Sequence, residues 1–195
     1  MQTNHRETWL NMITDSHIRP YFQSKGYTIP TNVKMSCSFT SKGSKSNRIG
    51  ECWTDSASEG GNFEIFISPK ISDSIRTVDI LIHELVHATV GIQAGHGKPF
   101  ADCAKAVGLT GKMTATVATE ELKAIIQEWV SVMGEYPHAT LQDNGMKKQS
   151  TRMIKCVCSH CDYQVYTSRK WIAVSIPQCP DMYCEFYGLE MQVEQ

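Results

Sequence analysis

The sequence predicts an α+β fold in which one mixed domain is followed by a small cysteine-rich module. Segments that alternate between apolar and polar residues lie between positions 33 and 68, and segments with apolar residues at helical spacing lie on both sides of them. The cysteines are distributed unevenly, because five of the eight fall between positions 156 and 184. We therefore expect a first domain over residues 1–145 and a second module over residues 150–195.

The first predicted element is an amphipathic helix over residues 6–25. Gly26 is expected to end this helix, and Pro20 is expected to kink or split it because proline has no backbone N–H. Its apolar residues recur at roughly helical spacing and are expected to pack into the core. They are Trp9, Leu10, Met12, Ile13, Ile18, Tyr21 and Phe22.

Three strands are predicted next. Apolar and polar residues alternate over 33–39 and, in part, over 63–67, whereas the strand over 49–54 is more weakly indicated. The polar segment 41–47 between the first two is expected to form a hairpin turn or a loop. Pro69 is expected to end the third strand.

Helices are predicted from there to the end of the first domain. The first follows Ser72 or Asp73, either of which can cap it, and ends at Gly91 or Gly95. Glycine, proline and polar residues over 134–151 then indicate the domain boundary. The two remaining helices are predicted over residues 99–107 and 119–133.

Composition limits the classes of function. Of 195 residues, 41% are hydrophobic and 20% are charged, which is enough apolar material for a core. The net charge of -1 excludes a protein that binds nucleic acid through overall charge, but not one with a local basic patch. No apolar run approaches the roughly 18 residues of a membrane helix, and no signal-peptide pattern follows the first residues. We therefore expect a cytoplasmic protein with no membrane partner.

Residues 83–87, His-Glu-Leu-Val-His, form an HExxH motif inside the first of these later helices. Positions i and i+4 share one helix face, so His83 and His87 can reach one metal ion. From the position after the first histidine, the Glu84 carboxylate can reach a water at the metal without being a ligand. The motif therefore predicts a catalytic zinc site with Glu84 as its base.

A catalytic zinc ion usually has three protein ligands, so a third must come from outside the motif. His96 lies nine residues after His87, between two glycines that can turn the chain back toward the ion. The metzincin pattern is excluded because it requires a glycine and a histidine where Val90 and Gln93 stand. A distant glutamate is the weaker alternative, with Glu120 or Glu121 as candidates. We expect His96.

Two cysteine pairs predict a second, structural zinc site. Cys158 and Cys161 form a CxxC pair, and Cys179 and Cys184 follow about 17 residues after it, a spacing that suits a four-cysteine zinc ribbon. Such a module is too small for a large core, so zinc would supply its folding energy. Residues 162–163 are expected to form a tight turn, and 163–174 to form two strands joined near residue 168. Cys156 and His160 are competing ligands, and a disulfide pair is the alternative to zinc.

These segments together resemble the SprT-like zinc metalloproteases, especially those of phages and bacteria, which are related to the Spartan proteases that act on DNA–protein crosslinks. The resemblance covers roughly residues 72–185. It rests on HELVHA (83–88), GHGKPF (95–100), the cysteine pairs, and residues 107–109, 111–118, 136–139 and 169–171. The wider spacing between Cys179 and Cys184 departs from the commoner family pattern.

The resemblance implies a zincin-like fold, followed by a zinc ribbon. It implies that His83, His87 and His96 bind the catalytic zinc and that Glu84 is the base. The expected function is a zinc-dependent endopeptidase that acts on DNA-associated proteins. Its protein substrate could pair as an added strand with residues 63–67. No oxyanion donor is evident, and Tyr136 and His138 are candidates only by their position after the last helix.

The alternative function is a zinc-stabilised adaptor for nucleic acid or a transcription complex, with little or no hydrolysis. Residues 147–170 contain six basic residues and one acid, interleaved with aromatic side chains that could stack on the bases of single-stranded DNA. The ribbon could equally recruit a protease to DNA or to DNA–protein complexes. The residues concerned are Lys147, Lys148, Arg152, Lys155, Arg169 and Lys170, with Tyr163, Tyr166 and Trp171.

Overall fold

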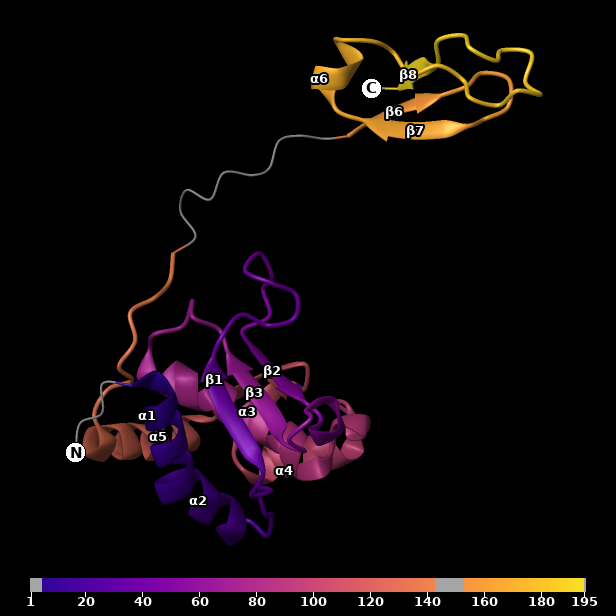
Figure 1. Cartoon of the computed structure of the whole chain (residues 1–195). Coiled ribbons are helices and arrows are strands. Elements are labelled where there is room, and N and C mark those ends of the chain that lie inside the picture. Colours follow the sequence, from indigo (N-terminus) through magenta and orange to yellow (C-terminus); the bar gives the residue numbers. More distant parts are fainter. Residues whose placement is uncertain (1–4, 143–152, 195) are drawn as a thin grey trace. The chain divides into compact units, whose positions relative to one another are not determined.

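The computed structural model describes residues 5–142 and 153–194, and the chain divides into two compact units, Met1–Asp143 and Asn144–Gln195. The first unit mixes helices with small sheets, and the second contains short strands and a cluster of four cysteines (Figure 1). The α+β class predicted from the sequence is therefore confirmed. None of the helices in the described ranges is long and apolar enough to cross a membrane.

The main sheet of the first unit has three strands in the order β1-β3-β2. Strand β1 (Val33–Cys37) is parallel to β3 (Phe63–Ile67), and β2 (Gly50–Trp53) is antiparallel to β3. These strands lie where alternation predicted them. Because β3 is central and hydrogen-bonded on both sides, the expectation that a substrate pairs with residues 63–67 is wrong. An added strand would have to use an edge strand of this sheet, β1 or β2.

The predicted N-terminal helix is one continuous helical segment with a change of winding. It runs as α1 (Arg6–Ile13), a π-helical turn (Thr14–Ile18) and α2 (Arg19–Ser24). The wide turn lies directly before Pro20, which cannot donate a backbone hydrogen bond and whose ring would clash with a carbonyl of a regular α-helix. Proline therefore changes the winding without breaking the helix. Trp9, Leu10, Ile13, Ile18 and Phe22 are buried in the core, as predicted.

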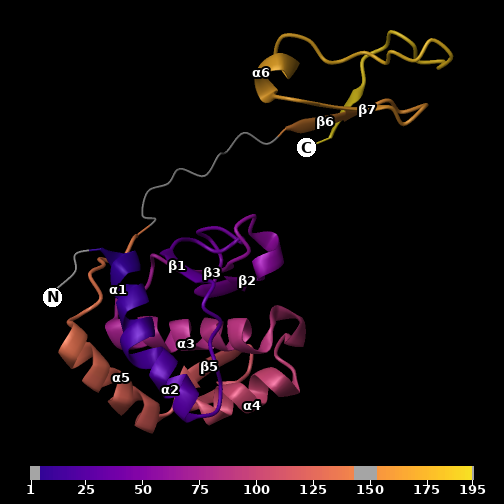
Figure 2. The same cartoon turned by 60° about the horizontal axis from the view of Figure 1, so that its bottom comes forward.

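Helix α3 (Ser74–Val90) lies along the sheet and packs against α4 (Lys98–Ala106) and α5 (Glu120–Met133), as Figure 2 shows. Between the two predicted caps the structure selects Asp73, whose side chain accepts a 2.7 Å hydrogen bond from the Arg76 amide. The helix ends at Gly91, which has φ of 86°, a value that favours glycine. Most of α3 is buried, so its position is fixed on several sides.

A hairpin that the sequence did not predict connects α4 to α5. Strands β4 (Leu109–Lys112) and β5 (Ala115–Ala118) pair antiparallel around a two-residue turn. Strand β5 contacts α3. Both strands are short and only weakly alternating, so local pattern gave little indication of them. This hairpin contributes Thr116 to the site described below.

The second unit has a three-stranded antiparallel sheet in the order β7-β6-β8. The strands are β6 (Ile154–Val157), β7 (Gln164–Thr167) and β8 (Gln192–Glu194), with α6 (Arg169–Ile172) after β7. The prediction of two strands over residues 163–174 is therefore half wrong, because its second half is a single helical turn. The small core consists mainly of Cys156, Cys158, Cys179, Cys184 and Met191.

Candidate metal centres

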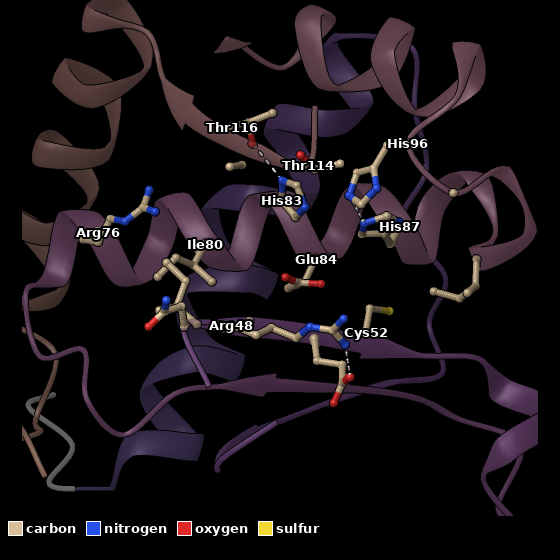
Figure 3. A pocket seen from close by; sticks show the side chains of 17 residues that line it. Arg48, Cys52, Arg76, Ile80, His83, Glu84, His87, His96, Thr114 and Thr116 are labelled. Carbon is tan, nitrogen blue, oxygen red and sulfur yellow. Dashed lines mark hydrogen bonds and ion pairs between the residues drawn. The ribbon is translucent and has the colours of Figure 1, made fainter. Parts of the chain in front are cut away.

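Helix α3 positions the HExxH residues on the face that lines a cavity of about 570 Å³. The chain turns after Gly91 through a short 3-10 helix (Ile92–Ala94) and a second left-handed glycine, Gly95, with φ of 51°. This double turn brings His96 back over the helix, so that it faces His83 and His87 (Figure 3). The three predicted histidines therefore meet in one place.

The three histidines lie close enough together to share one metal ion. One ligand nitrogen from each lies within 4.8 Å of the others, and Nε2 of His87 is 3.2 Å from Nε2 of His96. Two nitrogens bound tetrahedrally to zinc at about 2.05 Å would be about 3.3 Å apart. Three imidazoles are also a donor set that suits zinc and similar ions. The group could therefore hold a metal ion.

Burial keeps these histidines neutral at pH 7. Burial first, and then the neighbouring histidines, lower the pKa of His83 to about 4 and that of His87 to about 3, with Arg76 also lowering the pKa of His83. Burial also lowers the pKa of the more exposed His96. A metal ligand must offer a deprotonated ring nitrogen. No proton therefore has to be removed from these rings before a metal ion binds at neutral pH.

Thr116 holds the ring of His83 from the opposite wall. Its hydroxyl lies 2.7 Å from Nδ1 of His83, and the Thr116 side chain is buried in β5. With Nδ1 engaged in this bond, the Nε2 atom of the same ring is left for a metal ion. Sequence reasoning missed Thr116, because the hairpin that positions it was not predicted.

Glu84 is buried between α3 and β2. Burial, together with the nearby Glu51 carboxylate and partly offset by Arg48, raises the pKa of its carboxyl group to about 8. Strand β2 approaches α3 so closely here that a Cβ atom at Gly50 would overlap the Glu84 carboxylate and the Ile80 side chain. Only glycine lets the strand and the carboxylate share this space. Sequence reasoning did not single out Gly50 either.

Charged residues surround the cavity. Arg48 and Arg76 line it, with Arg48 paired to Glu51 at 2.5 Å and Arg76 paired to Asp79. The alternative metal ligands Glu120 and Glu121 are not among its lining residues. Within the described chain, the donors brought together are therefore the three histidines, with Glu84 beside them.

The two suggested oxyanion donors lie elsewhere in the first unit. The Tyr136 ring is buried 5.2 Å from that of Trp9, and Nε2 of His138 is 2.8 Å from the carbonyl oxygen of Pro69. Neither residue lines the cavity of the three histidines. The position of these residues after the last helix therefore does not bring them to the site.

Comparison of the chain with models of protein families, with curated proteins and with solved structures found no match.

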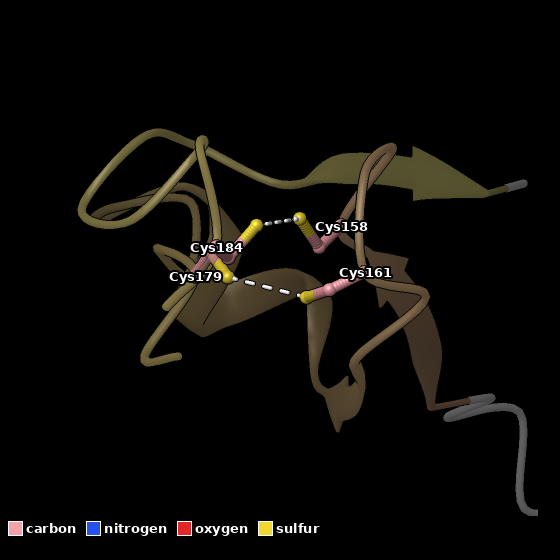
Figure 4. Close-up of side chains that lie close together, drawn as sticks. All are labelled: Cys158, Cys161, Cys179 and Cys184. Atoms are coloured by element: carbon pink, nitrogen blue, oxygen red, sulfur yellow. Dashed lines mark hydrogen bonds between the residues drawn. The ribbon is translucent and has the colours of Figure 1, made fainter. Parts of the chain in front are cut away.

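The four predicted cysteines meet in the second unit. Their sulfur atoms all lie within 4.8 Å of one another and point toward a common centre (Figure 4). Cys158 and Cys184 are 3.7 Å apart, and Cys161 and Cys179 are 3.6 Å apart. A disulfide would require about 2.05 Å, whereas two sulfurs bound tetrahedrally to zinc at about 2.3 Å are about 3.8 Å apart. The distances favour a metal over disulfides.

Local backbone structure prepares the first cysteine pair for this role. Asp162, with φ of 56°, forms the predicted tight turn, and its amide donates to the Cys158 carbonyl. Backbone amides of Cys161 and His160 point at the Cys158 sulfur and lower the pKa of that thiol to about 6. Cys158 is therefore readily available as the thiolate that binds a metal.

The competing ligands occupy different places. Cys156 is fully buried in β6 and is not part of the group of four. His160 lies closer, with Nδ1 3.3 Å from the Cys184 sulfur. In this position the imidazole can donate a hydrogen bond to a thiolate, a common way of supporting a metal ligand.

The aromatic residues proposed to stack on bases are exposed. Tyr163, Tyr166 and Trp171 have exposed fractions of 45%, 58% and 59%. Lys170 lies over the Trp171 ring, and Lys155 pairs with Glu194. Lys147, Lys148 and Arg152 lie outside the described residues. The aromatic side chains are therefore not needed to fill the core of the second unit.

Proposed function

We propose that this chain is a zinc-dependent endopeptidase of the SprT-like type that cleaves DNA-associated proteins. The observation that carries the proposal is the convergence of His83, His87 and His96 beside a buried carboxylate, Glu84, in one open cavity. A purely structural zinc site uses four protein ligands and has no need of a base. Three ligands and an adjacent base are the arrangement of a hydrolytic centre.

The second unit contributes a structural role to this proposal. Cys158, Cys161, Cys179 and Cys184 would hold the second zinc ion with no open position, which stabilises a unit whose core is very small. Helix α3 beneath a mixed sheet, with an antiparallel edge strand over the motif, agrees with a zincin-like first unit.

The residues of the cavity have complementary roles. Zinc held by the three histidines would polarise a peptide carbonyl and make water more acidic. Glu84 would accept the proton of the attacking water and later deliver it to the leaving amine. Burial raises the pKa of this carboxyl group, which favours delivery of the proton to the leaving amine, and the positive charge of a bound zinc ion would lower the pKa so that the carboxylate could first accept that proton. Arg48 offers a positive charge at the same cavity.

Strand β2 is the element best placed to align a substrate. Its residues Gly50, Glu51 and Cys52 line the cavity, and it is an edge strand of the β1-β3-β2 sheet. An extended peptide that pairs with this edge would pass directly over Glu84. Main-chain pairing of this kind depends little on side chains, so the enzyme would require unfolded or flexible segments in its substrates.

Two variants test the hydrolase proposal. Glu84→Gln is nearly isosteric, so it should keep zinc but lose nearly all hydrolysis of an unfolded protein, because the base is missing. His96→Ala should lose zinc affinity as well as activity, because a ligand is missing. Glu128→Gln, an exposed change on α5, is the matched control and should behave like the wild-type chain.

Zinc content by native mass spectrometry, measured beside a peptidase assay with and without single-stranded DNA, separates these outcomes. We expect two zinc ions per wild-type chain. Full hydrolysis by Glu84→Gln would contradict the enzyme proposal, and full zinc retention by His96→Ala would contradict the ligand assignment.

A second candidate function is favoured by the exposed aromatic residues of the second unit. Tyr163, Tyr166 and Trp171 accompany Arg169 and Lys170, a combination that can stack on bases and contact phosphates. The unit would then be a single-stranded DNA adaptor, either alone or in service of the protease. DNA binding that persists in Glu84→Gln, together with no hydrolysis by the wild-type chain, would favour the adaptor alone.

A further inference from the structure

The loop after the third metal-site cysteine displays an unusual amount of apolar surface. It is the acidic aromatic loop, residues 181–190, which is yellow in Figure 1. Five of its large side chains are exposed, although chains usually bury such groups. They are Met182 (71%), Tyr183 (94%), Phe186 (37%), Tyr187 (56%) and Leu189 (55%).

Backbone hydrogen bonds hold this loop in one shape. The Cys184 amide donates to Asp181 at 3.0 Å, the Gly188 amide to Cys179 at 2.9 Å, and the Cys179 amide to Leu189 at 3.0 Å. Two of these bonds tie the loop to Cys179, and Cys184 belongs to the sulfur cluster itself. The aromatic side chains therefore extend from an ordered backbone, so less conformational entropy is lost when a partner binds the loop.

Charge in the second unit is sharply segregated. Residues 172–195 contain four acids, Asp181, Glu185, Glu190 and Glu194, and no Lys, Arg or His. Glu194 already pairs with Lys155 at 3.0 Å, and the Glu185 carboxylate, whose side chain is 79% exposed, lies 3.5 Å from Nε2 of His160; Glu190 is exposed. The basic residues lie before this segment. The loop therefore repels phosphate, although its aromatic residues alone would suit a nucleic acid.

We propose that the acidic aromatic loop is a docking surface for a cationic protein segment, one that carries Lys or Arg beside apolar residues. The exposed Tyr and Phe side chains would contribute most of the binding energy, because aromatic side chains dominate binding at protein interfaces. Fixing these side chains in one conformation also costs little conformational entropy. Glu185 and Glu190 would select for positive charge and accelerate association. The Tyr rings would also accept Lys or Arg over their faces. This inference depends on neither the histidine site nor hydrolysis.

Binding of unfolded proteins to the full chain tests the proposal. The probe is reduced, carboxamidomethylated lysozyme, which is unfolded and cationic, with the acidic α-lactalbumin prepared in the same way for comparison. Glu84→Gln serves as the background so that no probe is cleaved. We expect Tyr183→Ser/Tyr187→Ser to weaken lysozyme binding about tenfold, and Glu185→Gln/Glu190→Gln to weaken it and reduce its salt dependence. α-Lactalbumin should bind far more weakly.

Matched controls distinguish a cationic protein segment from single-stranded DNA or a second copy of the chain as the partner of this loop. Tyr163→Ser/Tyr166→Ser removes two exposed tyrosines from the same unit and should leave lysozyme binding unchanged. Tyr183→Ser alone, at the most exposed site, provides a second variant in case the double change disturbs the fold, which zinc content would report. Unchanged lysozyme binding in the Tyr183 variants would overturn the proposal. So would a loss of single-stranded DNA binding, or a loss of self-association, as their main effect.

Discussion

Gly50→Ala would insert a methyl group between β2 and α3, at the place where the strand approaches the candidate base. The new Cβ would lie 2.6 Å from Cγ2 of Ile80 and would overlap the Glu84 carboxylate. Both neighbours are buried, so neither can swing into solvent. Overpacking of this kind costs about 1–3 kcal/mol. Alanine restricts the unfolded chain and regains about 0.4–1 kcal/mol, which leaves a net destabilisation of about 1.3 kcal/mol at the midpoints of the two ranges and at most about 2.6 kcal/mol.

Hydrolysis should fall much more than stability. A displacement of about 1 Å in a catalytic group can cost about 100-fold in rate, and the carboxylate is what the new methyl group would push. Zinc should stay, because the three atoms nearest to the added Cβ belong to Glu84 and Ile80, not to a histidine. Peptidase rate, denaturant midpoint and zinc content, measured on the same preparation, report the three effects separately.

A double-mutant cycle sharpens this experiment. Ile80→Ala removes the Cγ2 atom, so Gly50→Ala should destabilise the Ile80→Ala background by less than it destabilises the wild-type chain. Equal costs in both backgrounds would show that the two side chains do not meet. A Gly50→Ala chain with wild-type stability and wild-type rate would refute the close approach of β2 to Glu84 altogether.

Three further predictions concern the two metal sites and the basic residues within 147–170. Thr116→Val should lower zinc affinity of the histidine site about 10–100-fold, because His83 loses its hydrogen bond; Thr116→Ser should restore it, and chelator competition measures both. If the Thr116→Val chain bound zinc as tightly as the wild-type chain, Thr116 would have no role in the histidine site. Cys161→Ser should unfold the second unit and leave one zinc ion per chain, by circular dichroism and native mass spectrometry; two retained ions would disprove the four-cysteine assignment. Changing four basic residues to alanine should weaken binding of single-stranded DNA and make that binding less dependent on salt concentration. Unchanged binding would place the DNA surface elsewhere. These four are Lys147, Lys148, Arg169 and Lys170.

The parts of the fold that depend on local pattern were predictable from the sequence. Helical period, an N-terminal cap and a glycine end defined α3, and the motif spacing brought His83 and His87 to one face. His96 was predictable because flanking glycines are a local signal for a turn. The cysteine pairs were predictable for the same reason, since each pair forms its own turn.

Features that depend on distant neighbours could not be predicted in this way. Gly50 and Thr116 matter only because β2 and β5 come to lie on opposite sides of α3, and nothing in their own segments indicates this. Likewise, the pairing of β3 on both edges is a property of the whole sheet, so a substrate-binding role for residues 63–67 looked reasonable from alternation alone. The sequence 169–172 is too short for its period to distinguish a helical turn from a strand.

All three candidate ligands of the histidine site lie within residues 83–96, a single helix end and the turn that follows it. Closing so short a loop costs little entropy, so the segment could capture a metal ion while much of the surrounding chain is still loose. The position of the Glu84 carboxylate depends instead on strand β2, because Gly50 packs against it and lies far away in the sequence. In increasing denaturant, hydrolysis should therefore be lost at lower concentrations than metal. A partly unfolded chain would then survive as an inactive metal carrier and could regain activity without a new supply of zinc.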